Sequence, residues 1–480
     1  MINLASYTAS RDGLWSSTST WGGSGPPGNG DTVTIPSGIT VTFDVDQSGF
    51  ASGLSGLTVN GTLKWKTDTK TYLKMASNVN ISGTGTLQVG EESNPIQRPP
   101  SGSSTRATIK LQGTGKITVP NLLCYGWDER LNRTTVALPT SSGNQIKISD
   151  DMNLQPGDQI VIGSGTVKGA LTETAKGIYT VSSYSSSSRT ITLSSAIEHT
   201  RNEGDFVGLY NRTITLDGGT DSIYSPSTPG TATFRGVLSN RSIGTTSPNN
   251  SAPSDMILGD HLTLTSSSPA GKLVGDQKYQ NFVKDSTFYN VHVNWSPNTT
   301  FKDTIHIHNE SVSYGFVSHA AGAFFDNCWF QNGYAVVYKE LTLGHGFSYH
   351  RGCKAMNLSS RAYGYRTHKI EVYDMDFTGI NPTDSIYYPM RFYDCIFSTI
   401  AIDYGAGATG EGFFESFNHN KEPGNYHLYQ HGGVTVKDTT NKAPGKDYSL
   451  KTSLSSNKPV VVGKNMGTLE PGETIYLSAW

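Results

Sequence analysis

The chain has 480 residues, 16% of them charged, and a formal net charge of −2 at pH 7. A balance this close to neutral argues against a nucleic-acid-binding surface, which is normally basic. No apolar run approaches the roughly 18 residues of a membrane-spanning helix, so we expect no membrane insertion.

The composition is typical of an all-β protein. Glycine contributes 53 residues and tyrosine 24, and the serines, threonines and aromatics show no helical periodicity. The first residues, MINLASYTASRDGLW, contain neither the basic nor the apolar region of a signal peptide. We therefore expect either that a signal was removed or that the protein leaves its cell by another route, such as inside a virion.

Residues 1–144 contain short strands separated by turns. After a Gly/Pro-rich run, Val33, Ile35, Val41 and Phe43 alternate with polar residues, as in half-buried strands. Aligned glycines in the segments LTVNGTLKW, VNISGTGTLQV and IKLQGTGKITV then recur at intervals of 24 and 30 residues. Such intervals match one coil of a solenoid, with glycine where the chain turns.

These segments carry a family resemblance. The pattern from Trp15 through Trp21, the GDTVTIPSG run at 30–38 and the NGTL turn at 60–63 resembles the eight-glycine domain of fibrocystin and the cell-migration-inducing hyaluronan-binding proteins. The likeness continues through LQPGD at 154–158 and NRTITLD at 211–217, so that it covers about residues 14–220. The resemblance implies that residues 1–144 form the first coils of a β-helix. It also implies a protein that binds or degrades extracellular polysaccharide.

Residues 145–215 depart from the coil rhythm. Their short strands are separated by serine- and glycine-rich turns, which predicts a small β subdomain inserted into the solenoid.

Residues 216–405 contain a clearer repeat. An aspartate flanked by apolar residues recurs in FVKDSTF at 282–288, FKDTIHI at 301–307 and FFDNCWF at 324–330, with later copies around Asp374 and Asp394. A strand unit that repeats at intervals of about 22 residues indicates a solenoid, because a single coil cannot bury its own apolar face. The repeated aspartate is best explained as a turn residue.

We therefore predict an all-β fold, a right-handed parallel β-helix over residues 31–405 with the inserted subdomain. Residues 406–480 should form an irregular C-terminal β module that caps the last coil, since an open end would leave strand edges unpaired. The predicted interior side chains are Val33, Ile35, Phe43, Leu63, Leu87, Ile117, Ile305, Ile307, Cys328, Phe330 and Phe397.

Histidines and carboxylates of the later coils could carry chemistry. If Ile305 and Ile307 face the core, His306 and His308 point outward from the same strand. Their imidazoles could protonate a sugar leaving group, bind a divalent metal or simply be solvated rungs of the solenoid. We expect no cofactor and no dedicated metal site. The candidate catalytic residues are Asp303, His306, His308, Glu340 and Asp376.

Aromatic and basic residues concentrate in the last coils. Outward Tyr, Trp and Arg side chains at coil spacing suit stacking on sugar rings, although they could equally cover loops or form a subunit interface. The candidate ligand-binding residues are Trp295, Trp329, Tyr338, Tyr349, Arg351, Tyr365 and Arg391.

Two classes of function remain open from the sequence. The first is a binding protein that attaches to a host-surface polysaccharide, similar to a phage tail fibre or tailspike, as a homotrimer with other tail proteins of a virion. A secreted bacterial glycan-binding protein is the alternative within this class. The second is an enzyme on the same fold, a polysaccharide depolymerase acting as a glycoside hydrolase or lyase.

Overall fold

The computed structural model describes residues 4–140, 142–163, 177–197, 200–219, 222–226, 230–243, 254–265, 281–291, 299–307 and 324–331. Beyond residue 331 it describes the backbone of strands between residues 348 and 465. None of the helices within these ranges has the length and apolarity that a bilayer span requires.

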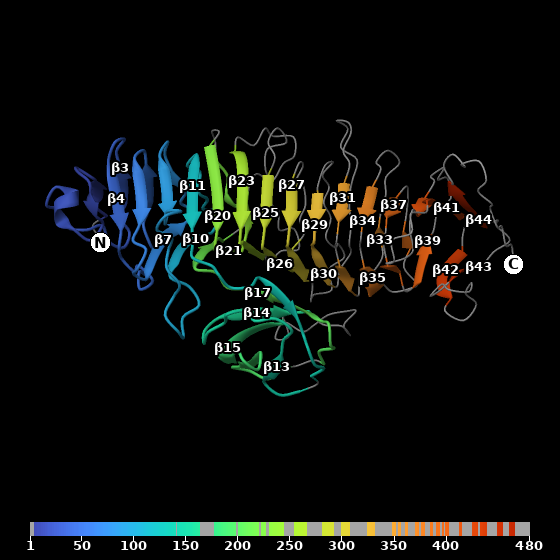
Figure 1. Ribbon diagram of the computed structural model, residues 1–480. Coiled ribbons are helices and arrows are strands. Elements are labelled where there is room, and N and C mark those ends of the chain that lie inside the picture. The colour runs from blue at the N-terminus through green and yellow to red at the C-terminus, as the bar shows by residue number, and fades with distance from the viewer. Residues whose placement is uncertain are drawn as a thin grey trace.

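The described strands stack into a rod (Figure 1). One long sheet of 16 strands runs along it. Its members are β2 (Gly13–Leu14), β4 (Thr40–Phe43), β6 (Thr62–Trp65), β9 (Thr86–Val89), β11 (Asn121–Tyr125), β20 (Gly230–Arg235), β23 (Ser254–Asp260), β25 (Asn281–Lys284), β27 (Thr299–Lys302), β29 (Phe324–Asp326), β31 (Ser348–Arg351), β34 (Ile370–Tyr373), β37 (Met390–Tyr393), β40 (Gly412–Phe414), β41 (Asn425–Gln430) and β44 (Val460–Asn465).

A second sheet of 11 strands forms another wall of the rod. It contains β7 (Thr71–Ser77), β10 (Ala107–Gln112), β18 (Ile214–Asp217), β21 (Val237–Ser239), β24 (Thr263–Thr265), β26 (Thr287–Tyr289), β28 (Ile305–Ile307), β30 (Trp329–Gln331), β32 (Lys354–Met356), β35 (Asp376–Gly379) and β38 (Ile396–Phe397).

Shorter sheets complete the coils. They are formed by β1 (Ser6–Thr8), β3 (Thr32–Ile35), β5 (Gly56–Val59) and β8 (Ile81–Ser82); by β19 (Ser222–Tyr224) and β22 (Ser242–Ile243); and by β33 (Arg361–Ala362), β36 (Ser385–Ile386), β39 (Thr399–Ile402), β42 (Gly433–Asp438) and β43 (Ser449–Leu454). A 3-10 helix, η1 (Thr18–Trp21), lies before β3.

Successive coils pair in parallel, one coil to the next. In the long sheet, Val283 of β25 lies opposite Phe301 of β27, which lies opposite Phe325 of β29. The last pairings are antiparallel, β40 with β41 and β39 with β42. The predicted all-β parallel β-helix is therefore confirmed.

The coils from β23 to β30 turn from the long sheet into the second sheet through a left-handed residue. His261, Asp285, Asp303 and Asn327 occupy this corner in four successive coils, with φ between 45° and 55°. Asn, Asp and His are the non-glycine residues that best tolerate this conformation. The repeated Asp285 and Asp303 are therefore turn residues, as predicted. In the next coil Asn327 takes the corner, whereas Asp326 is the last residue of β29.

The corner fixes which side chains enter the rod. After it, Thr304 and His306 point inward, so that the His306 ring stacks between Phe288 and Phe330 at centroid distances of 4.6 and 4.7 Å. Ile305 and Ile307 point outward instead. The predicted orientation of β28 is therefore wrong, because the inward alternation begins at Thr304, one residue earlier than expected.

All but one of the remaining predicted core residues are buried inside the rod. Eight of them belong to the rod's main apolar cluster: Val33, Ile35, Phe43, Leu63, Leu87, Ile117, Cys328 and Phe330. The side chain of Phe397 lies outside the described residues.

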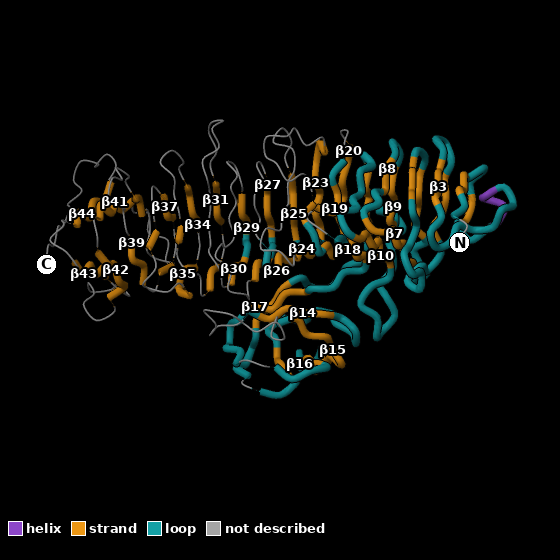
Figure 2. The backbone as a smooth tube through the Cα atoms, turned by 180° about the vertical axis from the view of Figure 1, so that it is seen from behind, coloured by secondary structure: helices purple, strands orange, loops and turns teal. Residues whose placement is uncertain are grey.

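An antiparallel subdomain interrupts the rod between β11 and β18 (Figures 1 and 2). Its strands, in the order β12-β17-β14-β15-β16-β13, are β12 (Arg133–Thr135), β13 (Gln145–Lys147), β14 (Gln159–Ile162), β15 (Ile178–Ser185), β16 (Thr190–Leu193) and β17 (Phe206–Leu209). It has its own apolar core, which includes Ile146, Ile160 and Ile191. The inserted sheet begins at Arg133, before the boundary at residue 145 expected from the sequence.

The inserted subdomain docks on the second sheet. Ile305, Ile307 and Tyr289 face outward from the rod and form a small apolar cluster with Val161 and Phe206 of the insertion. The approach is close at Gly208 in β17, where a Cβ atom would lie 3.2 Å from Ile305 Cγ2 and 3.3 Å from Thr287 Cγ2.

We predict that Gly208→Val loosens this docking. Overpacking at a closed interface costs about 1–3 kcal/mol, so the midpoint of chemical unfolding should fall and protease cleavage near residue 210 should accelerate. Gly49→Val is the matched control, because a Cβ at Gly49 would meet nothing within 4 Å. Equal unfolding midpoints for the two variants would contradict this account of the interface.

Candidate functional site

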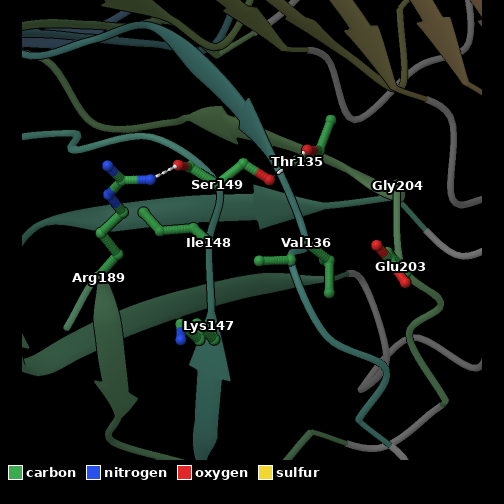
Figure 3. Close-up of a pocket in the computed structure, with 9 residues that line it drawn as sticks. Thr135, Val136, Lys147, Ile148, Ser149, Arg189, Glu203 and Gly204 are labelled. Atoms are coloured by element: carbon green, nitrogen blue, oxygen red, sulfur yellow. Dashed lines mark hydrogen bonds between the residues drawn. The ribbon is translucent and has the colours of Figure 1, made fainter.

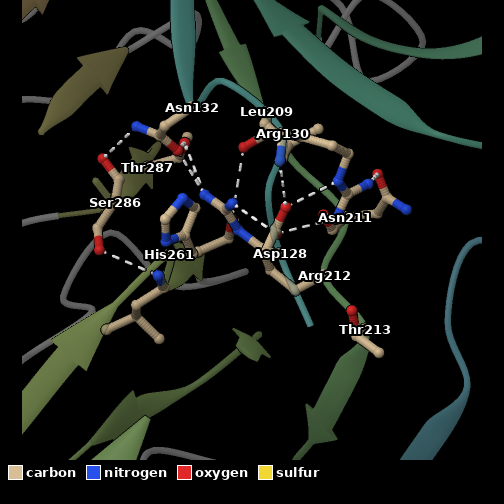
Figure 4. A network of polar contacts seen from close by, with 12 residues as sticks. Asp128, Arg130, Asn132, Leu209, Asn211, Arg212, Thr213, His261, Ser286 and Thr287 are labelled. Carbon is tan, nitrogen blue, oxygen red and sulfur yellow. Dashed lines mark hydrogen bonds and ion pairs between the residues drawn. The ribbon is translucent and has the colours of Figure 1, made fainter. Parts of the chain in front are cut away.

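A buried ion network holds the two connections between the rod and the inserted subdomain (Figure 4). Arg130 donates from Nε and Nη2 to the two carboxylate oxygens of Asp128, both at 2.9 Å, and from Nη1 to Asp158 Oδ1 at 2.7 Å. Arg212, on the return to β18, donates from Nη1 to Asp128 Oδ2 at 3.0 Å. Arg98 reaches the second oxygen of Asp158 at 2.9 Å.

The pKa of the Asp128 carboxyl lies well below its usual range. Burial by itself would raise this pKa, but the nearby guanidinium groups of Arg130 and Arg212 outweigh burial and favour the ionised form. Asp128 is therefore buried as a charged carboxylate, and Arg130 and Arg212 both stabilise its charge.

The same network reaches the rod. Arg212 Nε donates to Thr263 Oγ1 of β24 at 2.8 Å, and Thr287 Oγ1 of β26 donates to Asn132 Oδ1 at 3.0 Å. Asn132 Nδ2 donates to the carbonyl of Ser286 at 3.1 Å. Polar side chains of the insertion are thus joined to two successive coils, next to the left-handed corner.

Three titratable side chains meet at that corner, and we call them the acidic corner: Asp260, His261 and Asp285. One ligand atom from each lies within 4.8 Å of the other two. His261 Nδ1 is 2.7 Å from Asp260 Oδ1. Lys284 Nζ is 3.2 Å from the other carboxylate oxygen of Asp260.

The two carboxyls of the acidic corner have opposite pKa shifts. Burial would raise the pKa of Asp260, but hydrogen bonds and charge from His261 and Lys284 lower it below the ordinary value. Burial raises the pKa of Asp285, and burial together with the carboxylates of Asp303 and Asp260 outweighs the opposite effect of His261 and Lys284. Carboxyl pairs whose environments separate their pKa values are the arrangement used for paired acid and base roles.

The inserted subdomain contributes a cation beside this corner. Arg133 of β12 forms an ion pair with Asp303, with 3.2 Å between Nη2 and Oδ1. Its Nη1 donates to the carbonyls of Thr304 and Asn327. The guanidinium also lies over the ring of Trp329, 4.4 Å from its centroid.

The acidic corner offers two kinds of chemistry. Its two carboxylates and one imidazole are a suitable ligand set for a divalent cation. The same groups could move protons, since the pKa of Asp285 is raised and that of Asp260 is lowered.

The structure separates the sequence-predicted catalytic residues. Asp303 lies beside the acidic corner, at the left-handed position of its coil. His306 is fully buried inside the rod, where its Nε2 is 2.9 Å from Thr304 Oγ1. His308 and Glu340 lie outside the described residues, as does the side chain of Asp376. The roles predicted for these three stay predictions.

Of the predicted ligand-binding residues, the structure describes the side chain of Trp329 alone. Trp329 does point outward from the rod, but Arg133 and Phe206 of the inserted subdomain cover its ring. Trp295, Tyr338 and Tyr365 lie outside the described residues. Tyr349, Arg351 and Arg391 are described only as backbone, in β31 and β37.

Sequence analysis missed Asp260 and His261. The segment GDHLTL at 259–264 has the frame of KDSTF, with His261 in the place of Asp285, but it contains no aspartate at the corner position. A search that accepted any Asn, Asp or His at the turn would have found this coil.

We predict that Asp128→Asn destabilises the protein by about 3–5 kcal/mol, because it leaves buried arginines without their carboxylate. The folded-state pKa of Asp128 is depressed, so its contribution is present above the unfolded value of about 3.9 and is lost as pH falls below it. The difference in unfolding free energy between wild type and variant should therefore shrink in acid. Asp68→Asn, at an exposed carboxyl, should change the unfolding free energy little at any pH.

Comparison with known proteins identifies the first coils. A model of the G8 domain matches residues 20–126. Human fibrocystin-L is 31% identical over 222 residues, which cover 43% of this chain and 5% of that protein. The chain thus spans a small part of the length of this relative.

Solved structures similar to the chain include phage tailspikes. The tailspike protein gp49 from Pseudomonas phage LKA1 is 12% identical, with 82% of this chain and 89% of that chain covered at a TM-score of 0.22. The Gp54 tailspike of Acinetobacter baumannii bacteriophage AP22, solved in complex with A. baumannii capsular saccharide, is 10% identical, with coverages of 84% and 77% and a TM-score of 0.19. The G8 match at residues 20–126 covers the segments whose resemblance to the eight-glycine domain the sequence indicated.

Proposed function

We propose that this protein binds an extracellular polysaccharide and cleaves a glycosidic bond at the acidic corner. The observation that supports cleavage is the pair of carboxyls, Asp260 and Asp285, with opposite pKa shifts and one oxygen of each within 4.8 Å of the other. The G8 resemblance supports polysaccharide as the ligand.

In the proposed reaction, Asp285 is the general acid. Its raised pKa keeps the carboxyl protonated to higher pH than an ordinary aspartate, so that it can protonate the oxygen of the leaving sugar. Asp260 stays ionised on the opposite side of the bond and attacks the anomeric carbon as the leaving sugar departs with the proton of Asp285. Water, deprotonated by Asp285, then hydrolyses the glycosyl ester on Asp260, which frees the sugar and restores both carboxyls. A carboxyl separation of about 5 Å is that of glycosidases that retain the anomeric configuration.

His261 is the proposed positioning residue. Its Nδ1 contacts Asp260, and its place at the left-handed turn fixes the imidazole next to both carboxyls. Lys284 balances the charge of Asp260 from the neighbouring coil. The residues thus divide between one carboxyl with a raised pKa, one with a lowered pKa, and two groups that contact the second.

We propose a tail fibre or tailspike-type protein that attaches to a host-surface polysaccharide, located in the virion tail as a homotrimer with other tail proteins. The alternative is a secreted, extracellular glycan-binding protein. The two settings share the polysaccharide ligand and differ in the partners of the rod.

We predict that Asp285→Asn abolishes shortening of a polysaccharide that the wild-type protein cleaves, as measured by size-exclusion chromatography of the polymer. Asparagine tolerates the left-handed turn, so the corner should stay folded and polymer binding should persist. Wild-type cleavage should fall as pH rises through the elevated pKa of Asp285, because the acid then loses its proton. Asp68→Asn should cleave normally. Undiminished cleavage by the Asp285 variant would place the chemistry elsewhere.

The trimer is tested independently by sedimentation equilibrium. We expect a mass of three chains at micromolar concentration. A single species with the mass of one chain would contradict the homotrimer without bearing on the acidic corner.

A further inference from the structure

The inserted subdomain carries a separate pocket of about 420 Å³, within the range of roughly 300–1,000 Å³ typical of small-ligand sites. The pocket lies between the β12 and β13 strands and the turns that hold Arg189 and Glu203 (Figure 3). Its lining residues are Thr135, Val136, Ala137, Lys147, Ile148, Ser149, Arg189, Glu203 and Gly204.

The side chains that line this pocket are polar at the rim and apolar at the base. Lys147, Arg189 and Glu203 are exposed, whereas Val136 and Ile148 are buried. Figure 3 shows the two cations on one side and Glu203 across from them. Two cations against one carboxylate give the lining a net positive charge.

Hydroxyl groups lie between the charged residues. Thr135 Oγ1 and Ser149 Oγ are 2.8 Å apart, and either can donate to the other. Backbone groups around them are already used in the sheet, since Ser149 N donates to the carbonyl of Thr135 and Ala137 N to the carbonyl of Lys147. A ligand would therefore be held by side chains.

Arg189 has an unusual backbone conformation for its residue type. Its φ is 53°, in the left-handed region, at the turn between β15 and β16. Residues other than glycine, asparagine and aspartate are uncommon there, and such backbone strain concentrates at functional positions. Arg189 Nη1 donates to the carbonyl of Ser149, which fixes the guanidinium at the edge of the pocket.

We propose that this pocket binds a carboxylate-bearing sugar residue of a polysaccharide. The guanidinium of Arg189 matches a carboxylate in geometry and charge, and Lys147 adds a second cation on the same side. The hydroxyls of Thr135 and Ser149 and the carboxylate of Glu203 pair with the hydroxyl groups of the sugar. The pocket is a second binding site, formed by residues distinct from those of the acidic corner.

The test is calorimetric titration of the full-length protein with an oligogalacturonate and with its carboxyl-reduced counterpart. These probes differ only in the carboxylate. We expect the charged oligosaccharide to bind at least about tenfold more tightly, the difference of one charged hydrogen bond. We expect Arg189→Asn and Lys147→Gln each to weaken its binding about tenfold, whereas Lys70→Gln on the rod leaves it unchanged.

A stability measurement separates binding from folding. Asparagine adopts the left-handed conformation more readily than arginine, so the unfolding midpoint of Arg189→Asn should not fall. Equal affinities for the two oligosaccharides, or wild-type affinity in Arg189→Asn, would overturn the proposal. Asp285→Asn should retain pocket binding, so failure of the pocket and failure of the proposed cleavage are told apart by different variants.

Discussion

The left-handed corner between the two long sheets is the constraint on which the later coils depend. One residue must turn the chain with positive φ, and its N–H still bonds to the next coil, as Asp285 N does to the carbonyl of Lys302 and Asp303 N to that of Asp326. The following residue then points into the rod. This fixes the inward set, Ser286 and Phe288 in one coil and Thr304 and His306 in the next, regardless of which side chains are apolar.

The corner thereby creates the docking site of the insertion. It turns Ile305, Ile307 and Tyr289 outward, where a rod alone would expose them to water, and the inserted subdomain covers them with Val161 and Phe206. The buried ion network beside this contact is a different kind of interaction. Removing two charges from water roughly offsets their attraction, so Asp128, Arg130 and Arg212 contribute geometric specificity to the docking more than net stability.

The sequence predicted the coils better than the direction of their side chains. Alternation and spacing were enough for the β-helix and for the turn role of Asp285 and Asp303. Alternation and spacing gave the wrong orientation for His306, because histidine is counted as a polar, exposed residue. In the rod its imidazole stacks between Phe288 and Phe330, and Thr304 supplies a hydrogen-bond partner. The acidic corner was not predicted, for two reasons. Asp260 and Asp285 come together only when successive coils stack, and the repeat motif did not include His261 as a corner residue.

Docking of the insertion and ionisation of the acidic corner are electrostatically linked. The negative charge of Asp303 adds to burial in raising the pKa of Asp285. Arg133, which the insertion supplies, pairs with that same Asp303 and is held in place by the carbonyls of Thr304 and Asn327. With the insertion docked, Arg133 compensates part of the Asp303 charge, which opposes the contribution of Asp303 to the raised pKa of Asp285. The position of the inserted subdomain therefore influences the pKa of Asp285, the proposed acid, even though none of its residues belongs to the acidic corner.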